Sequence, residues 1–490
     1  MNENNHKNND KDLKAHFQED INNPSNNKRK KKSFSSKNQI AAEYMANSND
    51  SIYFKIINTE EEFKSFNAPI GQDNLDNTFQ PKYTYNIFTD KQEIIGYKNL
   101  RIKISLTPKT LSPYINIQYE DALKIKDDII YLLRDFYNKI FEQSEHYYEE
   151  NKIVIEEILQ TSEERFLKYL ASENEVETKH NIVCQTQKDS LNLEIIHLSV
   201  LESKFFRENL LLQCFLTYFI DGGSPIPLDT GFWNYFILFE KDKDSKRRLI
   251  GFCSTHHFHL EITRYRSLTS QFLIMPNQHR KGYGQFLLEE IYNYYMQIPE
   301  CIQISTEDPA KEFEILRDIV IFKRNLELGH FEKFLKLPAL LNKDTYKLIK
   351  FTKEDLDTLS TKLKISKAIL QSSLDILKYC LINRKESKSS FSILIKEYKR
   401  DIKIKFFKAA REDYEVDYDF NRRKMRKKRG PYIFLHDEEE KVFDIDSLEL
   451  QQMSEVEVKE ILEGSSNAFI DDMKAISVKC EKLINDHLKN

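Results

Sequence analysis

The chain has 490 residues, of which 40% are hydrophobic and 31% charged, and its net charge is −4. This length allows two to four domains, and so small a net charge points to no particular class of partner. The six cysteines form no CxxC pair, which argues against a zinc cluster and a secreted disulfide framework. The N-terminus lacks the apolar core of a signal peptide, and no apolar run approaches the roughly 18 residues of a membrane span. We therefore expect an intracellular protein with reduced cysteines and no membrane segment.

Residues 1–50 are rich in Asn, Lys, Asp and Ser and contain too few apolar residues to offset chain entropy, so we expect a disordered tail. The basic run 28–32 in this tail is either a nuclear import signal or a solvated charge run. A second basic run, 422–429, could bind nucleic acid or act in import. No aromatic residues interleave with it as a single-strand stacking site requires, so a solvated helix face is favoured there.

Residues 51–200 mix helical and strand patterns, which predicts an α/β domain. Strands are expected where apolar and polar residues largely alternate, and helices where apolar residues recur every three to four positions. The expected strands are 52–57, 99–105, 114–119 and 192–198, and the expected helices are 131–141 and 153–169.

Residues 201–325 begin with a strongly apolar stretch, 205–220, that we expect to be a buried helix. Three consecutive strands follow and predict an antiparallel meander. A helix then crosses over to a fourth strand, which should lie parallel to the third. The expected strands are 233–239, 249–255, 270–275 and 301–306, and the crossover helix is 283–297, with 264–268 as a link before the third strand.

Residues 326–490 have mainly helical periodicity, and their last part is acidic. Helices are expected over 354–363, 366–382 and 391–407, and the acidic stretch 437–490 is expected to be helical, with a surface for a partner.

The rest of the chain is organised around the stretch 271–308. This stretch predicts, in order, a strand, a glycine loop, a helix, a second strand and a pair of acids. Gly282 and Gly284 open the helix, so that backbone N–H groups can approach a phosphate at its positive end. On its own this spacing is weak, because many helices begin with glycines for turn geometry alone.

The sequence on either side of the two glycines strengthens the prediction of a phosphate-binding loop. The stretch resembles the acetyl-coenzyme A motif of the GNAT superfamily, and three segments, 219–241, 272–295 and 304–320, resemble the catalytic subunit of the type B histone acetyltransferase. Flanking segments 96–104 and 351–382 extend the resemblance to about 50–385. The resemblance implies an α/β fold with a GNAT core at 201–325, between an α/β N-terminal domain at 51–200 and a helical region at 326–490.

The resemblance also implies which residues bind acetyl-CoA. The backbone of Phe272, Leu273 and Ile274 would pair with the pantetheine amides. The family's Gln/Arg position falls on His279, with Gln278 as an alternative if the loop shifts by one residue. The residues expected to cradle the pyrophosphate are His279, Arg280, Lys281, Gly282, Tyr283, Gly284 and Gln285.

Glu307 matches the family's catalytic glutamate and is the predicted general base. A lysine ammonium has a pKa of about 10.4, so it must lose a proton before it can attack a thioester. A positioned base contributes about 10²–10⁴-fold to such a reaction. Asp308 and Asp221 are candidates to support it. Asp308 has a second interpretation, which we favour: it caps a helix starting at Pro309.

The resemblance places Trp233 beside the substrate peptide, although a lone tryptophan on a strand could equally be a sheet-core aromatic. His256, His257 and Phe258 match the next peptide-contacting stretch. A metal site at His256, His257 and His259 is weakly supported, because strand alternation turns neighbouring side chains to opposite faces. Two loop carboxylates could face a basic peptide or be merely solvated: Asp90 and Glu93.

The predicted function is transfer of acetyl from acetyl-CoA to lysines in the N-terminal tail of free histone H4, without a metal. The resemblance implies a WD-repeat histone-binding partner and a location in nucleus and cytoplasm, and direct nucleic-acid binding is not expected. Two alternatives stay open. One is a GNAT enzyme for another protein or small amine, and the other is a catalytically silent histone-binding scaffold.

Overall fold

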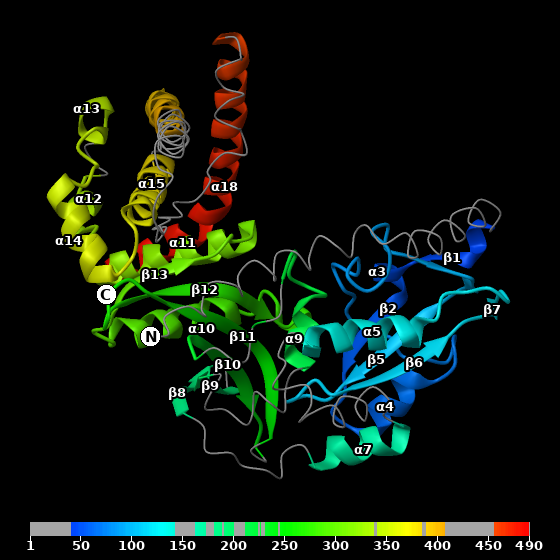
Figure 1. The fold of residues 1–490 in the computed structure, drawn as a ribbon. Helices are drawn as coiled ribbons and strands as arrows, with labels where there is room; N and C mark the ends of the chain where they lie inside the picture. The colour runs from blue at the N-terminus through cyan, green and yellow to red at the C-terminus, as the bar shows by residue number, and fades with distance from the viewer. Residues whose placement is uncertain are drawn as a thin grey trace, which may run out of the picture. The chain divides into compact units, whose positions relative to one another are not determined.

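A computed structural model describes residues 41–142, 162–172, 181–188, 191–199, 211–223, 226, 231–243, 246–337, 341–384, 389–406 and 455–489. They form a mixed α/β structure of two compact units (Figure 1). The first unit contains the described residues up to 172 together with 211–223. The second contains 181–199 and the described residues from 226 onward. Both basic runs, most of the expected tail, and residues 437–454 lie outside the described residues.

The first unit is built around a three-stranded sheet in the order β2–β5–β6. β2 runs parallel to β5, and β5 pairs antiparallel with β6, as the alternating patterns in these segments predict. One face is covered by an aromatic cluster that includes Phe63 of α4 and Phe166 of α7, whose rings stack at 5.0 Å. The bounds are β2 Ile52–Ile56, α4 Glu60–Asn67, β5 Arg101–Leu106, β6 Pro113–Gln118 and α7 Glu163–Ser172.

Short elements complete this unit. They are η2 Ala42–Tyr44, β1 Met45–Asn47, α3 Ser48–Ser51, β3 Glu93–Ile95, β4 Tyr97–Lys98, β7 Asp121–Ala122, α5 Ile129–Glu142 and α9 Leu211–Leu216. The expected helix 205–220 is therefore wrong in its length, since among its described residues the α-helix ends at Leu216 and turns follow. Aromatic packing rather than helical periodicity explains the apolar run after that point, because Tyr218 lies edge-on to Phe54 at 5.0 Å.

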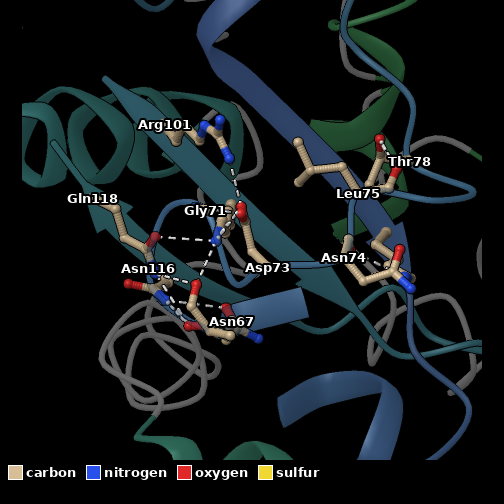
Figure 2. Close-up of polar contacts among 12 residues, drawn as sticks. Asn67, Gly71, Asp73, Asn74, Leu75, Thr78, Arg101, Asn116 and Gln118 are labelled. Carbon is tan, nitrogen blue, oxygen red and sulfur yellow. Dashed lines mark hydrogen bonds and ion pairs between the residues drawn. The ribbon is translucent and has the colours of Figure 1, made fainter. Parts of the chain in front are cut away.

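A buried ion cluster holds the loop after α4 against the sheet (Figure 2). Asp73 accepts hydrogen bonds from Arg101 at 2.7 Å and from the Gly71 N–H at 3.0 Å, and it lies 2.8 Å from the Lys103 ammonium. Lys103 also donates to the Gln118 side chain at 3.0 Å. Burial alone would raise the pKa of Asp73, but the bonds from Lys103 and Arg101 outweigh burial and lower that pKa to about 2.

The second unit is built on a six-stranded sheet in the order β13–β12–β11–β10–β9–β8. Its first five strands in chain order form an antiparallel meander, which confirms and extends the expected one. β8 was not predicted, and β12 begins five residues before the expected strand, at Tyr265, because the supposed link 264–268 alternates buried and half-buried positions from that residue on. The bounds are β8 Asn181–Lys188, β9 Leu191–Ser199, β10 Trp233–Lys241, β11 Arg247–His259, β12 Tyr265–Ile274 and β13 Cys301–Thr306.

Strands β8 and β9 belong to this sheet and to the second unit, although both lie within residues 51–200, which were expected to form the N-terminal domain. The boundary expected near that residue therefore does not coincide with the division between the two units. Pairing of β9 with β10 over Leu198↔Tyr235 to Asn192↔Lys241 explains why these strands join the later part of the chain.

Helix α10, Tyr283–Met296, packs on one face of this sheet and returns the chain to β13, which runs parallel to β12 as predicted. Its buried side chains include Leu287, Leu288, Ile291 and Tyr295, which follow the helical spacing seen in the sequence. Each such burial contributes about 1.5–3 kcal/mol.

The C-terminal helices pack around α11 in the second unit (Figure 1). α11 contacts α15 and α18, which also contact each other, and α14 lies against α15. The helical segments are α11 Lys311–Glu327, α12 Glu332–Leu335, α13 Lys343–Tyr346, α14 Lys353–Leu363, α15 Lys367–Asn383, residues 389–406 and α18 Glu455–Lys489. In the part of the chain that the structure describes, no helix combines the length and apolar character needed to cross a membrane.

Candidate active site

Glu307 lies where strands β12 and β13 part. Its backbone N–H donates to the Thr269 carbonyl at 2.9 Å, which continues the ladder one step beyond the last paired residues of the two strands. Its side chain is exposed, and one carboxylate oxygen accepts a 2.6 Å hydrogen bond from the Ser270 hydroxyl. A carboxylate with one short bond to a hydroxyl is oriented but keeps further lone pairs to accept a proton.

Beyond this point, no described strand pairs with the outer edge of β12. Its pairing with β13 ends at Thr269↔Thr306, yet β12 continues to Ile274. The Met275 N–H donates to Ile250 of β11, so by strand alternation the backbone groups of Phe272 and Ile274 face the opposite edge. The Leu273 backbone faces β11 instead. Of the three predicted cofactor-pairing residues, Phe272 therefore turns both its N–H and its C=O to the outer edge, and Ile274 turns its N–H there, since its carbonyl already accepts from the His279 ring.

The loop after β12 turns tightly into α10. Pro276–Gln278 form a 3₁₀ turn, and positive φ angles follow at Arg280 (63°) and Gly282 (80°). Gly282 is the N-cap, and the first helical bond runs from the Phe286 N–H to its carbonyl. Residues 283–285 precede this first intrahelical bond, so their N–H groups lie at the positive end of the helix, where an anion can bind in other proteins.

The glycines and charged residues of this loop have distinct surroundings. A methyl group added at Gly284 would lie 3.3 Å from Leu316 and 3.4 Å from Ile274, so the helix start is closely packed and a side chain there would require the end of Leu316 to shift slightly. The His279 ring donates to the Ile274 carbonyl at 2.7 Å, and Lys281 donates to the Gln278 side chain at 2.9 Å. His279 thus fastens the loop to the free strand edge, while Gln278 is engaged by Lys281.

Asp308 does not cap the following helix, and that prediction is wrong. α11 begins at Lys311, its N-cap is Ala310, and no side chain caps it. Pro309 and Ala310 stay outside the helix, which moves its start two residues beyond the position that an Asp-Pro pair indicates. Asp308 is exposed and has a φ of 33°, in the left-handed region that non-glycine residues rarely adopt.

Trp233 and His256 lie together on the sheet face opposite α10. They are directly paired between β10 and β11, and their rings meet edge to face at 4.8 Å. Trp233 is half-buried rather than part of the sheet core. Burial lowers the pKa of His256, and the negative charge of Glu307 opposes this effect. The imidazole is therefore close enough to feel the carboxylate at the strand junction.

His257 points the other way, toward α10, as the alternation argument predicts. Its ring stacks on Tyr265 at 4.1 Å, and its Nε2 lies 3.2 Å from the Tyr295 hydroxyl. Burial, followed by the neighbouring histidines, lowers the pKa of His257 to about 4, so the ring is neutral at pH 7. Phe258 returns to the His256 face, where the Arg266 guanidinium lies 5.2 Å from its ring centre. Of the two adjacent histidines, only His256 shares the face of Trp233.

The remaining predicted site residues lie in the first unit. Asp221 accepts a 2.7 Å hydrogen bond from the Tyr85 hydroxyl, which in turn accepts from the Gly222 N–H at 3.0 Å. This pair ties the turn after α9 to the segment that holds Asp90. Asp90 itself is exposed, and Glu93 is half-buried in β3. Asp221 therefore has a structural partner within its own unit.

Comparison with known proteins identifies relatives that cover up to 60% of this chain. Residues 44–221 match the family described as histone acetyl transferase HAT1 N-terminus. The chain is 27% identical over 303 residues to the histone acetyltransferase type B catalytic subunit of Homo sapiens, which covers 60% of this chain and 67% of that protein. It is 26% identical over 277 residues to the same subunit of Kluyveromyces lactis, covering 53% and 66%. The chain is therefore similar to type B catalytic subunits over more than half of its length.

The homology confirms the resemblance seen in the sequence and the prediction of an acetyltransferase. A subunit of the same name from Mus musculus is 28% identical over 292 residues, or 65% of its length, so the matches span about two thirds of these relatives. Acetyltransferases of this kind take acetyl-CoA as the acyl donor. Within the described residues, no group of three or more His, Cys, Asp or Glu side chains could hold a metal ion, and this includes His256, His257 and His259.

Ser270 is the site residue that the sequence did not indicate. It lies at an irregularity in the β11–β12 pairing, since Ser254 pairs with Gln271 and Thr255 with Thr269. Such a bulge redirects a side chain, and here the hydroxyl turns to Glu307. A serine within an apolar strand carries no bulge signal, so only the register reveals its role.

Proposed function

We propose that the chain is a histone lysine acetyltransferase with a GNAT core, which transfers acetyl from acetyl-CoA to the N-terminal tail of free histone H4 with Glu307 as general base. One observation carries the proposal: an exposed, hydroxyl-oriented carboxylate lies where two parallel strands part. The free edge of one of those strands leads directly to an open helix N-terminus. A donor strand edge and an anion site on one continuous segment suit a long, phosphorylated thioester.

The cofactor would be held mainly by backbone groups. Phe272 would supply its N–H and C=O, and Ile274 its N–H, to the pantetheine amides, as in pairing with an added strand, while His279 occupies the Ile274 carbonyl. The N–H groups at the start of α10 face the pyrophosphate, and the side chains of Arg280 and Lys281 add positive charge. Acetyl-CoA, when bound, supplies the thioester that is to be broken.

The chain's own contribution to the chemistry is to accept one proton from the substrate. At pH 7 only about one lysine in a few thousand is a free amine. Glu307 takes one proton from the lysine ammonium, directly or through a water, and the freed nitrogen lone pair attacks the thioester carbonyl. The new N–C bond forms and the C–S bond breaks. The coenzyme A thiolate is protonated as the nitrogen loses its second proton and becomes an amide. Ser270 holds the carboxylate in one orientation throughout.

The tail would lie over the face that carries Trp233 and His256. An aromatic ring and a largely neutral imidazole suit the apolar stem of the target lysine and its small neighbours. Asp90 and Glu93 are proposed to attract the basic tail. A WD-repeat histone-binding subunit is the proposed partner, and nucleus and cytoplasm are the proposed locations.

Mass spectrometry of an unmodified H4-tail peptide, incubated with acetyl-CoA and the purified chain, tests this function. The proposal expects one or more acetyl groups on the peptide and little transfer to spermidine at the same concentration. Preferred acetylation of spermidine would support the small-amine alternative. Coenzyme A binding without transfer to either substrate would contradict the proposal and support a silent scaffold.

A further inference from the structure

Edge strand β8 runs alongside helix α10, antiparallel to it. The thiol of Cys184 in the middle of β8 faces Glu290 on α10, and burial together with this carboxylate raises the pKa of the thiol to about 11. From Cys184 to the end of the strand is four residues, or about 13 Å. From Glu290 back to Gly282 is eight helical residues, or about 12 Å. The two lengths match, so the end of β8 lies beside the N-terminus of α10.

Lys188 is the residue that β8 places there. A methyl group added at Gly282 would lie 3.1 Å from the Lys188 ammonium nitrogen. Gly282 is the N-cap of α10, so the ammonium group lies directly over the glycine that opens the loop. This lysine is almost 100 residues from the glycine motif in sequence, and nothing in the local pattern around it indicates a binding role.

The charge at this position is unfavourable without an anion. A helix N-terminus carries about half a positive charge, which repels a cation. Arg280 and Lys281 bring two further cations to the same loop. Within the described residues, no carboxylate forms an ion pair with Lys188, whereas other half-buried lysines of this unit, such as Lys323, have one. Three cations at one positive helix end are stabilised together only if a multiply charged anion binds among them.

We propose that Lys188 is a binding residue for the pyrophosphate of acetyl-CoA. The inference rests on the proposed function, because it takes acetyl-CoA to be the anion at this loop. Pyrophosphate fits better than the adenosine 3′-phosphate, since the ammonium group lies over Gly282, whose following N–H groups form the anion site. β8 thereby becomes part of the cofactor site, although it lies at the far edge of the sheet from β12 and β13.

The test compares the binding of coenzyme A and of 3′-dephospho-coenzyme A by titration calorimetry. We expect Lys188→Ala to weaken both ligands about 10-fold and Lys188→Arg to restore most of the loss, because a charged hydrogen bond to phosphate is involved. Lys350→Ala, an exposed lysine of the C-terminal helical region, serves as the matched control and should bind as the wild type does. Unchanged melting temperatures establish that each variant is folded.

Two results would overturn the inference. Equal affinity of wild type and Lys188→Ala for coenzyme A would remove Lys188 from the site. A loss seen with coenzyme A but not with the dephospho form would assign the lysine to the 3′-phosphate instead. If wild type bound neither ligand, the proposed function would fail together with this inference, which separates that case from a failure of Lys188 alone.

Discussion

Two carboxylates, Asp73 in the first unit and Glu307 in the second, show how the surroundings of an anchoring acid differ from those of the proposed general base. The Asp73 side chain is 2% exposed, lies against two cations and accepts a backbone N–H. Glu307 is exposed, its carboxylate accepts a hydrogen bond from the Ser270 hydroxyl, and it directly follows strand β13. Saturated hydrogen bonding fixes Asp73 as an anion, whereas spare lone pairs leave Glu307 able to accept a proton.

Removing the charge of Asp73 should have the largest effect. Asp73→Asn would leave the fully buried Lys103 ammonium without its counter-charge, and we expect the first unit to lose about 3–5 kcal/mol of stability. Hydrogen exchange of peptides covering β5 and β6 measures this directly. Asp76→Asn, in the same loop but exposed, should change stability by less than about 0.5 kcal/mol. A loss equal to that of the control would mean that Asp73 is no anchor.

Lowering the pH should weaken the interactions of Asp73 in the wild-type protein. The pKa of Asp73 is lowered from 3.8 to about 2, so its contribution is complete above pH 4 and is lost as the pH falls toward 2. The stability involved is about 2 kcal/mol. Pepsin digestion between pH 4 and pH 2, mapped by mass spectrometry, should show cleavage within 101–118 increasing more steeply than cleavage within β10. Parallel increases in the two regions would contradict the expectation.

Removing the hydrogen bond that orients the Glu307 carboxylate tests the second half of the comparison. Ser270→Ala removes the hydroxyl that orients the carboxylate, and we expect kcat to fall about 5–30-fold, which corresponds to about 1–2 kcal/mol for the loss of one hydrogen bond. The KM for acetyl-CoA should stay within about twofold of wild type. Ser305→Ala is a matched control, because that hydroxyl contacts a backbone carbonyl on β12 rather than Glu307. Equal effects of the two variants would show that Ser270 has no special role.

The smallest expected effect concerns the tail-binding face. Trp233→Leu should raise the KM for an H4-tail peptide about 2–10-fold, the range that loss of one aromatic contact implies, and leave the KM for acetyl-CoA unchanged. Steady-state kinetics with each substrate varied separately makes the measurement. An increase in the KM for acetyl-CoA alone would move Trp233 from the peptide side to the cofactor side.

Much of the fold could be predicted because its strands and helices carry regular periodicity. The alternating strands of the first unit, the meander and α10 all lie within a few residues of their expected bounds. β8 was missed because it is an edge strand whose second half is polar, Gln-Thr-Gln-Lys, and such a strand has no core-facing apolar pattern. The start of α11 was misplaced because the local Asp-Pro signal was overridden by an extended Pro309–Ala310 segment.

The site was predictable only where its residues are adjacent in sequence. Gly282, Gly284 and Glu307 belong to one continuous stretch of sequence, 271–308. Ser270 and Lys188 reach the site through a strand bulge and through the run of β8 along α10. These are properties of register and packing between distant segments, which local sequence patterns do not encode.

The most direct test compares Glu307→Gln with Glu312→Gln, an exposed glutamate of the first turn of α11. Acetyl transfer to the H4-tail peptide is followed in a single turnover with saturating acetyl-CoA. If Glu307 is the general base, its variant should react about a hundredfold or more slowly than wild type while binding acetyl-CoA equally well, and the control should react at the wild-type rate. Transfer by Glu307→Gln at close to the wild-type rate would contradict the base assignment and leave the proton to another group.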